Sequence, residues 1–214
     1  MADAPMIRHQ VQEYLDKLAG KLPAPGGGSA AALAAALGAA SAQMVASFTV
    51  GNKKYAEVEE EVQGHLDAID AIRREMARLV DEDVTAYGGV GDAYGMPRGT
   101  DEEKAARAAA IQEALKSAAA VPMQLAEQCA ALVKHLPALL EKGNTNLVSD
   151  VGVAAKLTEA ACECAWLNVE VNLAWLKDEA FVSATRAETE ELLAEVRRTC
   201  IEVWEGAAKA IRRK

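Results

Sequence analysis

The sequence predicts an all-α protein, a single-domain helical bundle built around a long alanine-rich helix. Hydrophobic residues make up 51% of the chain, but alanine dominates that share and only 4% of the residues are aromatic. Alanine is the strongest helix former, whereas strands favour the β-branched and aromatic residues that are sparse here. No stretch alternates polar and apolar residues with period two, and no linker divides the chain. We therefore expect residues 1–214 to form one helical domain.

The first part of the chain contains the alanine-rich helix and its two neighbours. Apolar residues at helical spacing predict a helix over residues 6–20. After a break with two prolines and three glycines, Ser29 is expected to be the N-cap of an alanine-rich helix over about 29–49. Its small side chains allow close approach, so we expect it at the centre of the bundle. A polar corner at 51–55 leads into a long helix over about 55–90.

The long helix has one apolar face, which we expect to line the core. This stripe consists of Val58, Val62, Leu66, Ile69, Ile72, Met76, Leu79 and Val80. Glycines between 88 and 95 mark the end of the helix, because glycine disfavours helix interiors. Thr100 and Glu103 then form a capping box for a helix over 101–120.

The remaining chain is predicted to contain three more helices. Pro122 stands where a first-turn proline belongs and opens a helix to about residue 141, whose last turn is kinked by Pro137. A further helix is expected over 150–176. The last one, over about 179–212, is charged and amphipathic.

The balance of charge excludes several classes of partner. The chain has 23 Lys and Arg against 32 Asp and Glu, so its net charge is −9. A nucleic-acid-binding protein needs a basic face, so we predict no nucleic-acid partner. Residues 22–52 carry no charge, but they are rich in alanine, glycine and serine rather than in the large apolar residues that drive membrane insertion. We therefore predict no membrane span, and, without a signal peptide, a cytoplasmic location.

Neither the cysteines nor the histidines form a metal motif. The spacing Cys162-x-Cys164 lacks the gap and the second half of a zinc site. The other candidate ligands are scattered over the chain: Cys129, Cys200, His9, His65 and His135. We expect no metal site and, in a reducing compartment, free thiols.

The run Pro25-Gly26-Gly27-Gly28-Ser29 precedes the alanine-rich helix and is open to two interpretations. Backbone N–H groups at a helix N-terminus are unpaired and lie at the positive end of the helix dipole, so they attract anions and the polar edges of ligands. Glycines allow a ligand to reach that backbone because no Cβ is in the way. The alternative is a flexible hinge, and the run by itself does not decide between the two.

Two charged features are candidates for ligand binding or chemistry. Lys53 and Lys54, followed by Tyr55, come directly after the uncharged helix and either bind a carboxylate-bearing ligand or form an ordinary solvated face. Asp83 shares a helix face with the apolar stripe and with Tyr87. Partial burial there would raise its pKa and suit it to proton transfer or to holding a cation, the alternative being an ordinary helical acid.

Polar residues also gather in the second half of the chain. A turn is predicted at 143–146, and Ser149 with Asp150 can cap the helix that follows. Asn168 and Asn172 stand four residues apart on one face of an otherwise apolar helix. Because buried amides need partners, this pair is either a structural hydrogen-bond clamp or part of a polar pocket.

Short segments spread over nearly the whole chain share one likeness. They are Pro23-Ala-Pro-Gly-Gly-Gly-Ser29, Val50-Gly-Asn-Lys-Lys-Tyr55, Leu79-Val-Asp-Glu-Asp-Val-Thr-Ala-Tyr87, Asp101-Glu-Glu-Lys104, Ile111-Gln112, Val121-Pro122, Glu141-Lys-Gly-Asn144, Ser149-Asp-Val-Gly-Val-Ala154 and Asn168-Val-Glu-Val-Asn172-Leu173. In this order they resemble the cyclodeaminase/cyclohydrolase family of folate enzymes.

The resemblance implies a helical bundle that forms a homodimer, with folate sites in clefts at the dimer. Cyclodeaminase members have a catalytic aspartate, and Asp83 matches its position. One departure is Asn52, where the family often has the first of three lysines, and this weakens the basic patch. Substrate contacts are expected from Gly26, Gly27, Gly28, Ser29, Lys53, Lys54, Tyr55, Gln112, Asn144, Asp150, Asn168 and Asn172, the lysines meeting the glutamate tail of the folate.

The activity implied is hydrolysis of 5,10-methenyltetrahydrofolate to 10-formyltetrahydrofolate, with a tetrahydrofolate derivative as substrate and no cofactor. The alternative is a cyclodeaminase that releases ammonia from 5-formiminotetrahydrofolate, which is less favoured because this chain contains no formiminotransferase half. A single carboxylate such as Asp83 suits hydrolysis, because it can pair with the cationic ring and accept a proton from water. A non-catalytic helical interaction protein is a third possibility, since conventional catalytic motifs are absent.

Overall fold

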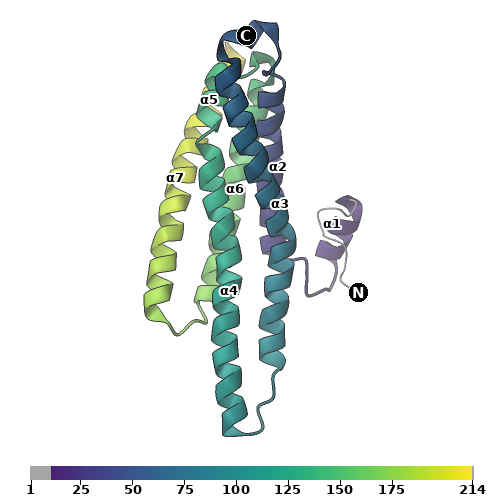
Figure 1. Ribbon diagram of the computed structural model, residues 1–214, viewed down its shortest axis with the longest axis vertical. Helices are drawn as coiled ribbons and strands as arrows, with labels where there is room; N and C mark the ends of the chain where they lie inside the picture. Colours follow the sequence, from purple (N-terminus) through teal and green to yellow (C-terminus); the bar gives the residue numbers. More distant parts are fainter. Residues whose placement is uncertain (1–10, 214) are drawn as a thin grey trace.

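The computed structural model describes residues 11–213, and within that range the chain contains α-helices, two short 3₁₀ helices and no strand (Figure 1). The helices are α1 (Val11–Ala19), α2 (Gly27–Ser47), η2 (Lys53–Val58), α3 (Glu59–Gly95), α4 (Asp101–Val133), α5 (Leu136–Lys142), η3 (Thr145–Leu147), α6 (Val148–Leu173) and α7 (Glu179–Arg212). The predicted all-α class is confirmed. Residues 6–10 of the predicted first helix, with His9, lie outside the described range.

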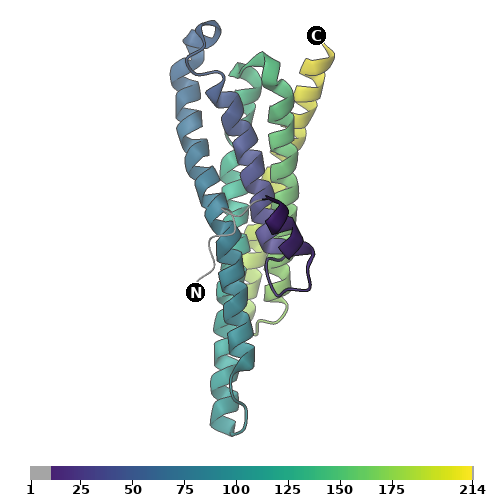
Figure 2. The ribbon, with the colours of Figure 1, turned by 90° about the vertical axis from the view of Figure 1, so that its right-hand side faces the viewer.

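The long helices run side by side along the axis of the molecule, and α1 lies outside them (Figures 1 and 2). The hairpin of α3 and α4 extends beyond the other helices at one end of the bundle. The predicted apolar stripe of α3 does line the core, where Ile69, Met76 and Leu79 are fully buried. The last predicted helix, over 179–212, also agrees with α7.

The alanine-rich helix α2 packs between α3 and α6. Its small residues allow the close approach: a Cβ added at Gly38 would lie 2.9 Å from Thr158 Oγ1. The helix is not enclosed on all sides, however, since Leu37, Met44 and Phe48 are exposed on its outer face. The prediction of close packing is therefore confirmed where α2 contacts α3 and α6. The prediction that α2 lies at the centre of the bundle is wrong, because its outer face is open.

By length and composition α2 is also apolar enough to cross a membrane. More than half of its most apolar window is buried against other helices, and the core helix of a soluble protein passes the same test. The absence of a membrane span therefore stays a prediction.

Two helix ends that were predicted from glycine and proline are wrong. α3 continues through the glycines to Gly95, because α4 packs beside this extension and Ala93 contacts a small apolar cluster with Ile111 and Leu115. α4 is one helix from Asp101 to Val133 with Pro122 in its interior, so the prediction that this proline opens a helix is wrong.

Caps were predicted with mixed success. The capping box of Thr100 and Glu103 is confirmed. Pro137 lies in the first turn of the short helix α5 rather than kinking the last turn of a longer one. Ser149 and Asp150 lie inside α6, whose N-cap is Leu147, so they do not cap it.

Candidate active site

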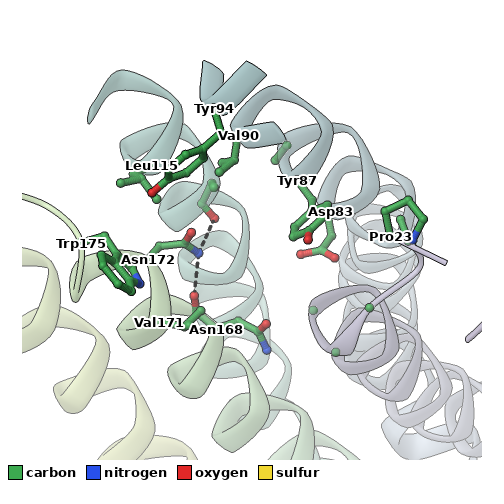
Figure 3. Close-up of a pocket in the computed structure, with 16 residues that line it drawn as sticks. Pro23, Asp83, Tyr87, Val90, Tyr94, Leu115, Asn168, Val171, Asn172 and Trp175 are labelled. Atoms are coloured by element: carbon green, nitrogen blue, oxygen red, sulfur yellow. Dashed lines mark hydrogen bonds between the residues drawn. The ribbon is translucent and has the colours of Figure 1, made fainter. Parts of the chain in front are cut away.

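A cleft of about 350 Å³ opens between the N-terminus of α2, the end of α3, the middle of α4 and the end of α6 (Figure 3). Its wall is largely apolar and aromatic, with a few polar groups, which is the usual character of a small-molecule site. The residues that line it are Pro23, Ala24, Gly26, Gly27, Gly28, Asp83, Ala86, Tyr87, Val90, Tyr94, Leu115, Ala118, Asn168, Val171, Asn172 and Trp175.

Asp83 provides the carboxylate of this cleft. It stands on α3, is half-buried, and its Oδ2 accepts a hydrogen bond of 2.9 Å from the backbone N–H of Ser29. Burial raises the pKa of Asp83 above its ordinary value, while the Ser29 N–H opposes this shift by stabilising the ionised form. The expected environment for proton transfer, a carboxyl group with raised proton affinity beside an open cleft, is therefore present.

The same contact caps α2. The N-cap residue is Gly26, which has no side chain to pair with the free N–H groups of the first turn, and the prediction of Ser29 as N-cap is wrong. The Asp83 carboxylate accepts from one of these N–H groups across the helix interface, at the positive end of the α2 dipole. One residue thus stabilises the helix start and presents a charged oxygen to the cleft.

Gly28 is required by the position of this carboxylate. A Cβ at Gly28 would overlap Asp83 Oδ1 and lie 2.7 Å from Asp83 Cγ, closer than real Cβ contacts come. Gly27 faces Asn168 at an ordinary 3.9 Å, and nothing lies within 4 Å of a Cβ at Gly26. The glycine run is therefore part of the cleft wall, and at Gly28 the small residue makes room for Asp83.

Ser29 supports the site from behind. It is fully buried, and its Oγ lies 3.0 Å from the hydroxyl of Tyr14, which is the buried residue of α1. Burial raises the pKa of Tyr14. The side chain of Ser29 therefore does not line the cleft, where we expected it to contact substrate. Its hydroxyl instead connects α1 to the start of α2.

The two amides of α6 line the cleft, and one of them is a structural clamp. Pro122 has no N–H for the carbonyl four residues before it, so the Ala118 carbonyl is left free inside α4. Asn172 Nδ2 donates to that carbonyl at 3.4 Å and to the Asn168 carbonyl at 2.8 Å (Figure 3). Asn168 Nδ2 donates to the Cys164 carbonyl at 2.8 Å, and this side chain lies opposite Gly27 at the cleft wall.

Gln112 does not line the cleft. Its side-chain amide is occupied by backbone groups: Nε2 donates to the Trp175 carbonyl at 3.1 Å, and Oε1 accepts from the Lys177 N–H at 2.8 Å. The prediction of a direct substrate contact is therefore not supported by the geometry within one chain.

The remaining predicted contacts lie at the other end of the bundle. Lys53, Lys54 and Tyr55 follow the C-terminus of α2, a helix of 21 residues and so about 30 Å long at about 1.5 Å per residue, whereas Asp83 lies at its N-terminus. In Figure 2 this corner is at the top of the molecule, far from the N-terminus of α2. Within one chain, the predicted residues therefore form two separate groups, one at each end of α2.

Asn144 connects the turn before α6 to the residues that follow α2, in the second group. Its backbone N–H donates to Thr49 Oγ1 at 2.9 Å and its Nδ2 donates to the Phe48 carbonyl at 3.1 Å. The Tyr55 hydroxyl accepts from the Thr145 N–H at 3.0 Å. Asp150, in the first turn of α6, belongs to this end as well.

Of the aromatic residues in the cleft, sequence reasoning placed Tyr87 on the face of Asp83 but missed Tyr94 and Trp175. Tyr87, Tyr94 and Trp175 line the cleft and are 56%, 47% and 68% exposed. Asp83, Tyr87 and Tyr94 have the spacing of one helix face, which extending α3 through its glycines would have revealed. Trp175 follows the end of α6, and no sequence signal links it to α3.

No group of three or more His, Cys, Asp or Glu residues in the described range has the arrangement of a metal site. The thiols of Cys129, Cys162 and Cys200 are buried and that of Cys164 is exposed, and all four are free. Burial raises the pKa of Cys200 to about 12, so this thiol stays protonated and unreactive.

Comparison with known proteins gives consistent matches over the chain. A family model described as formiminotransferase-cyclodeaminase matches residues 10–191. A methenyltetrahydrofolate cyclohydrolase from Methylorubrum extorquens is 45% identical over 86% of this chain and 89% of its own length. The formimidoyltransferase-cyclodeaminase of Rattus norvegicus is 35% identical over 90% of this chain, which spans only 36% of that protein.

A solved structure gives the same result for the fold. The formiminotetrahydrofolate cyclodeaminase from Thermotoga maritima matches with a TM-score of 0.85 and 32% sequence identity. The match covers 95% of this chain and 98% of that one.

Proposed function

The chain belongs to the formiminotransferase-cyclodeaminase family, and on this premise we propose that it is an enzyme that hydrolyses 5,10-methenyltetrahydrofolate to 10-formyltetrahydrofolate. The 45% identity to a methenyltetrahydrofolate cyclohydrolase extends over nearly the full length of both chains, whereas the two-activity relatives match over 36% of their length. The observation that carries the proposal is a single half-buried carboxylate, Asp83, in a largely apolar and aromatic cleft.

The reaction needs one base and no redox step. The substrate is a cationic amidinium ring that bridges N5 and N10 of the folate. Ionised Asp83 pairs with this cation and accepts a proton from water as the water oxygen bonds to the one-carbon unit. The tetrahedral adduct then breaks its bond to N5, which takes up one proton, and a second proton is released. Water is the only co-substrate, so we propose neither a cofactor nor a resident metal.

The experiment is an assay of the purified chain with two folates. Loss of methenyltetrahydrofolate absorbance without ammonia release is the result expected. Replacing Asp83→Asn should lower kcat by about 10²–10⁴, the usual contribution of general-base catalysis. Asp81→Asn, two residues away on another face of α3, is the control and should retain activity. Full activity of Asp83→Asn would contradict the assignment of the base.

A cyclodeaminase activity is the second candidate. It is supported by the 32% identity and TM-score of 0.85 to the Thermotoga maritima cyclodeaminase. In this case the chain would release ammonia from 5-formiminotetrahydrofolate in the same assay. A non-catalytic helical interaction protein, the third possibility, would act on neither folate.

We further propose that the enzyme is a homodimer in which each site is completed by the partner. Two observations support this. The open face of α2 presents Leu37, Met44 and Phe48 to solvent, an apolar row suited to a second copy. Lys53 and Lys54, expected to bind the glutamate tail, lie too far from Asp83 of the same chain to share its cleft.

Complementation tests this arrangement. A chain with Asp83→Asn and a chain with Lys53→Ala and Lys54→Ala, carrying different tags, are co-expressed and the mixed dimer is purified. If the sites are shared, the mixed dimer contains one fully native site and recovers activity on polyglutamylated substrate that neither parent shows. A mixed dimer no more active than its parents would place each site within one chain.

A further inference from the structure

Trp175 is the most exposed aromatic side chain of the cleft. It follows the end of α6, is 68% exposed, and stands at the edge of the cleft opposite Pro23 (Figure 3). A large apolar side chain exposed at a concave site, rather than alone on a convex surface, indicates ligand contact. Planar heteroaromatic rings are the chemistry that such a face binds best, since stacking requires only a second π-surface.

The segment that carries Trp175 is fastened by Gln112. Residues 174–178 connect α6 to α7. Gln112, on α4, donates from Nε2 to the Trp175 carbonyl at 3.1 Å and accepts at Oε1 from the Lys177 N–H at 2.8 Å. One amide therefore binds the backbone on both sides of residue 176 and uses its donor and its acceptor together.

A second contact to the same segment is weaker. Lys116, one helical turn further along α4, pairs with Asp178 through Nζ and Oδ2 at 2.9 Å. Exposed ion pairs of this kind contribute little to stability. Gln112 is thus the main polar contact between α4 and the backbone beside Trp175.

We propose that Gln112 is a positioning residue that holds Trp175 as the surface against which the planar ring system of the folate packs. The inference rests on the proposed function for the identity of the ligand. Gln112 acts through Trp175, because it does not line the cleft and its amide binds the backbone on both sides of residue 176.

The physical effect is on binding rather than on chemistry. Stacking of a planar base on an aromatic side chain corresponds to a factor of roughly 5–150 in affinity when the aromatic is replaced by alanine. Without Gln112 the segment keeps its bonds to the end of α6, where the Trp175 N–H donates to the Asn172 carbonyl at 3.3 Å, but it loses its bonds to α4 on both sides of residue 176. The segment then has more freedom to lose on binding, and part of the stacking free energy is lost as entropy. The water and the Asp83 carboxylate that react are not moved.

The experiment compares Trp175→Ala, Gln112→Ala and the double variant. We measure kcat and KM for methenyltetrahydrofolate and the Kd of tetrahydrofolate. Trp175→Ala should raise KM and Kd roughly 10-fold or more with little change in kcat, and Gln112→Ala should raise them by a smaller factor. The double variant should be no worse than Trp175→Ala, because removing the support of an absent ring has no further effect.

Two controls make the result specific. Gln124→Ala removes a glutamine of α4 that binds Arg78 away from the cleft, and it should leave KM unchanged. Gln112→Glu keeps an acceptor for Lys177 but places a carboxylate oxygen, which cannot donate, against the Trp175 carbonyl, so it should raise KM at least as much as Gln112→Ala does. Quenching of tryptophan emission by tetrahydrofolate should be reduced in Trp175→Phe.

Several outcomes would overturn the inference. They are a normal KM in Gln112→Ala, effects of the two single variants that multiply in the double variant, or a loss of kcat at unchanged KM in Gln112→Ala. Failure of the proposed function is seen separately, because the wild type would then not turn over methenyltetrahydrofolate.

Discussion

The two glycine-rich runs beside the cleft differ in what surrounds them. In the run that opens α2, a Cβ at Gly28 would overlap the Asp83 carboxylate, so the small residue is required by a contact. In the run at the end of α3, no atom lies within 4 Å of a Cβ at Gly88, Gly89 or Gly91. No contact explains these glycines, and each costs a helix about 1 kcal/mol relative to alanine. The first run fixes a reactive group, and the second weakens the helix that carries Tyr87 and Tyr94.

The largest effect expected from this comparison is that of Gly28→Ala. The added methyl group displaces the Asp83 side chain and breaks its hydrogen bond to the Ser29 N–H. Since a base displaced by about 1 Å can cost about 10²-fold in rate, kcat for methenyltetrahydrofolate should fall by about that factor while the helical circular dichroism is retained. Gly27→Ala meets only an ordinary contact and should cost much less. Equal losses in the two variants would mean that the whole run, and not Gly28, is what the site needs.

Local sequence signals predicted the helices and the position of Asp83, but not what surrounds Asp83. The apolar stripe of α3 placed the carboxylate beside the core, and its burial and raised pKa agree with that placement. The cap of α2 comes from a residue 54 positions away, so it could not be found from residues near Ser29. The interior Pro122 is tolerated because Asn172 of α6 pairs with the carbonyl that the proline frees, and this too depends on tertiary packing.

The site was predicted less completely than the fold. The family resemblance indicated which residues to consider, but it could not show that Lys53 and Asp83 stand at opposite ends of a helix about 30 Å long. It also assigned Gln112 to the substrate, whereas the amide binds the backbone beside Trp175. Both differences arise because a sequence gives the order of the residues. It gives neither their distances in the fold nor the partners of each side chain.

A smaller effect is expected in the second run, where Gly89→Ala can be compared with Gly64→Ala. Both glycines are helical residues of α3, both are exposed, and neither has an atom within 4 Å of its Cβ position. Each substitution should stabilise the helix by roughly 0.5–1 kcal/mol, measured by denaturant unfolding for Gly64→Ala and by slower hydrogen exchange at 88–95 for Gly89→Ala. Only Gly89→Ala should also lower kcat, because Tyr87 and Tyr94 beside it line the cleft. If both variants keep full activity, the lower helix stability caused by the second run has no part in turnover.

The smallest effect concerns stability rather than rate, and it tests how tightly the first run encloses Asp83. The pKa of Asp83 in the folded chain is raised above its ordinary 3.8, with burial as the main cause. The fold therefore favours the protonated form, and the ionised form destabilises it at every pH above the folded pKa. This cost is absent below the unfolded pKa.

Asp83→Asn, which cannot ionise, should then have a higher Tm than the wild type at pH 7. The difference should shrink as the pH falls through the folded pKa and level off in stronger acid. A difference in Tm that does not vary with pH would mean that Asp83 is well solvated, and that the contact with Gly28 places the carboxylate without changing its proton affinity.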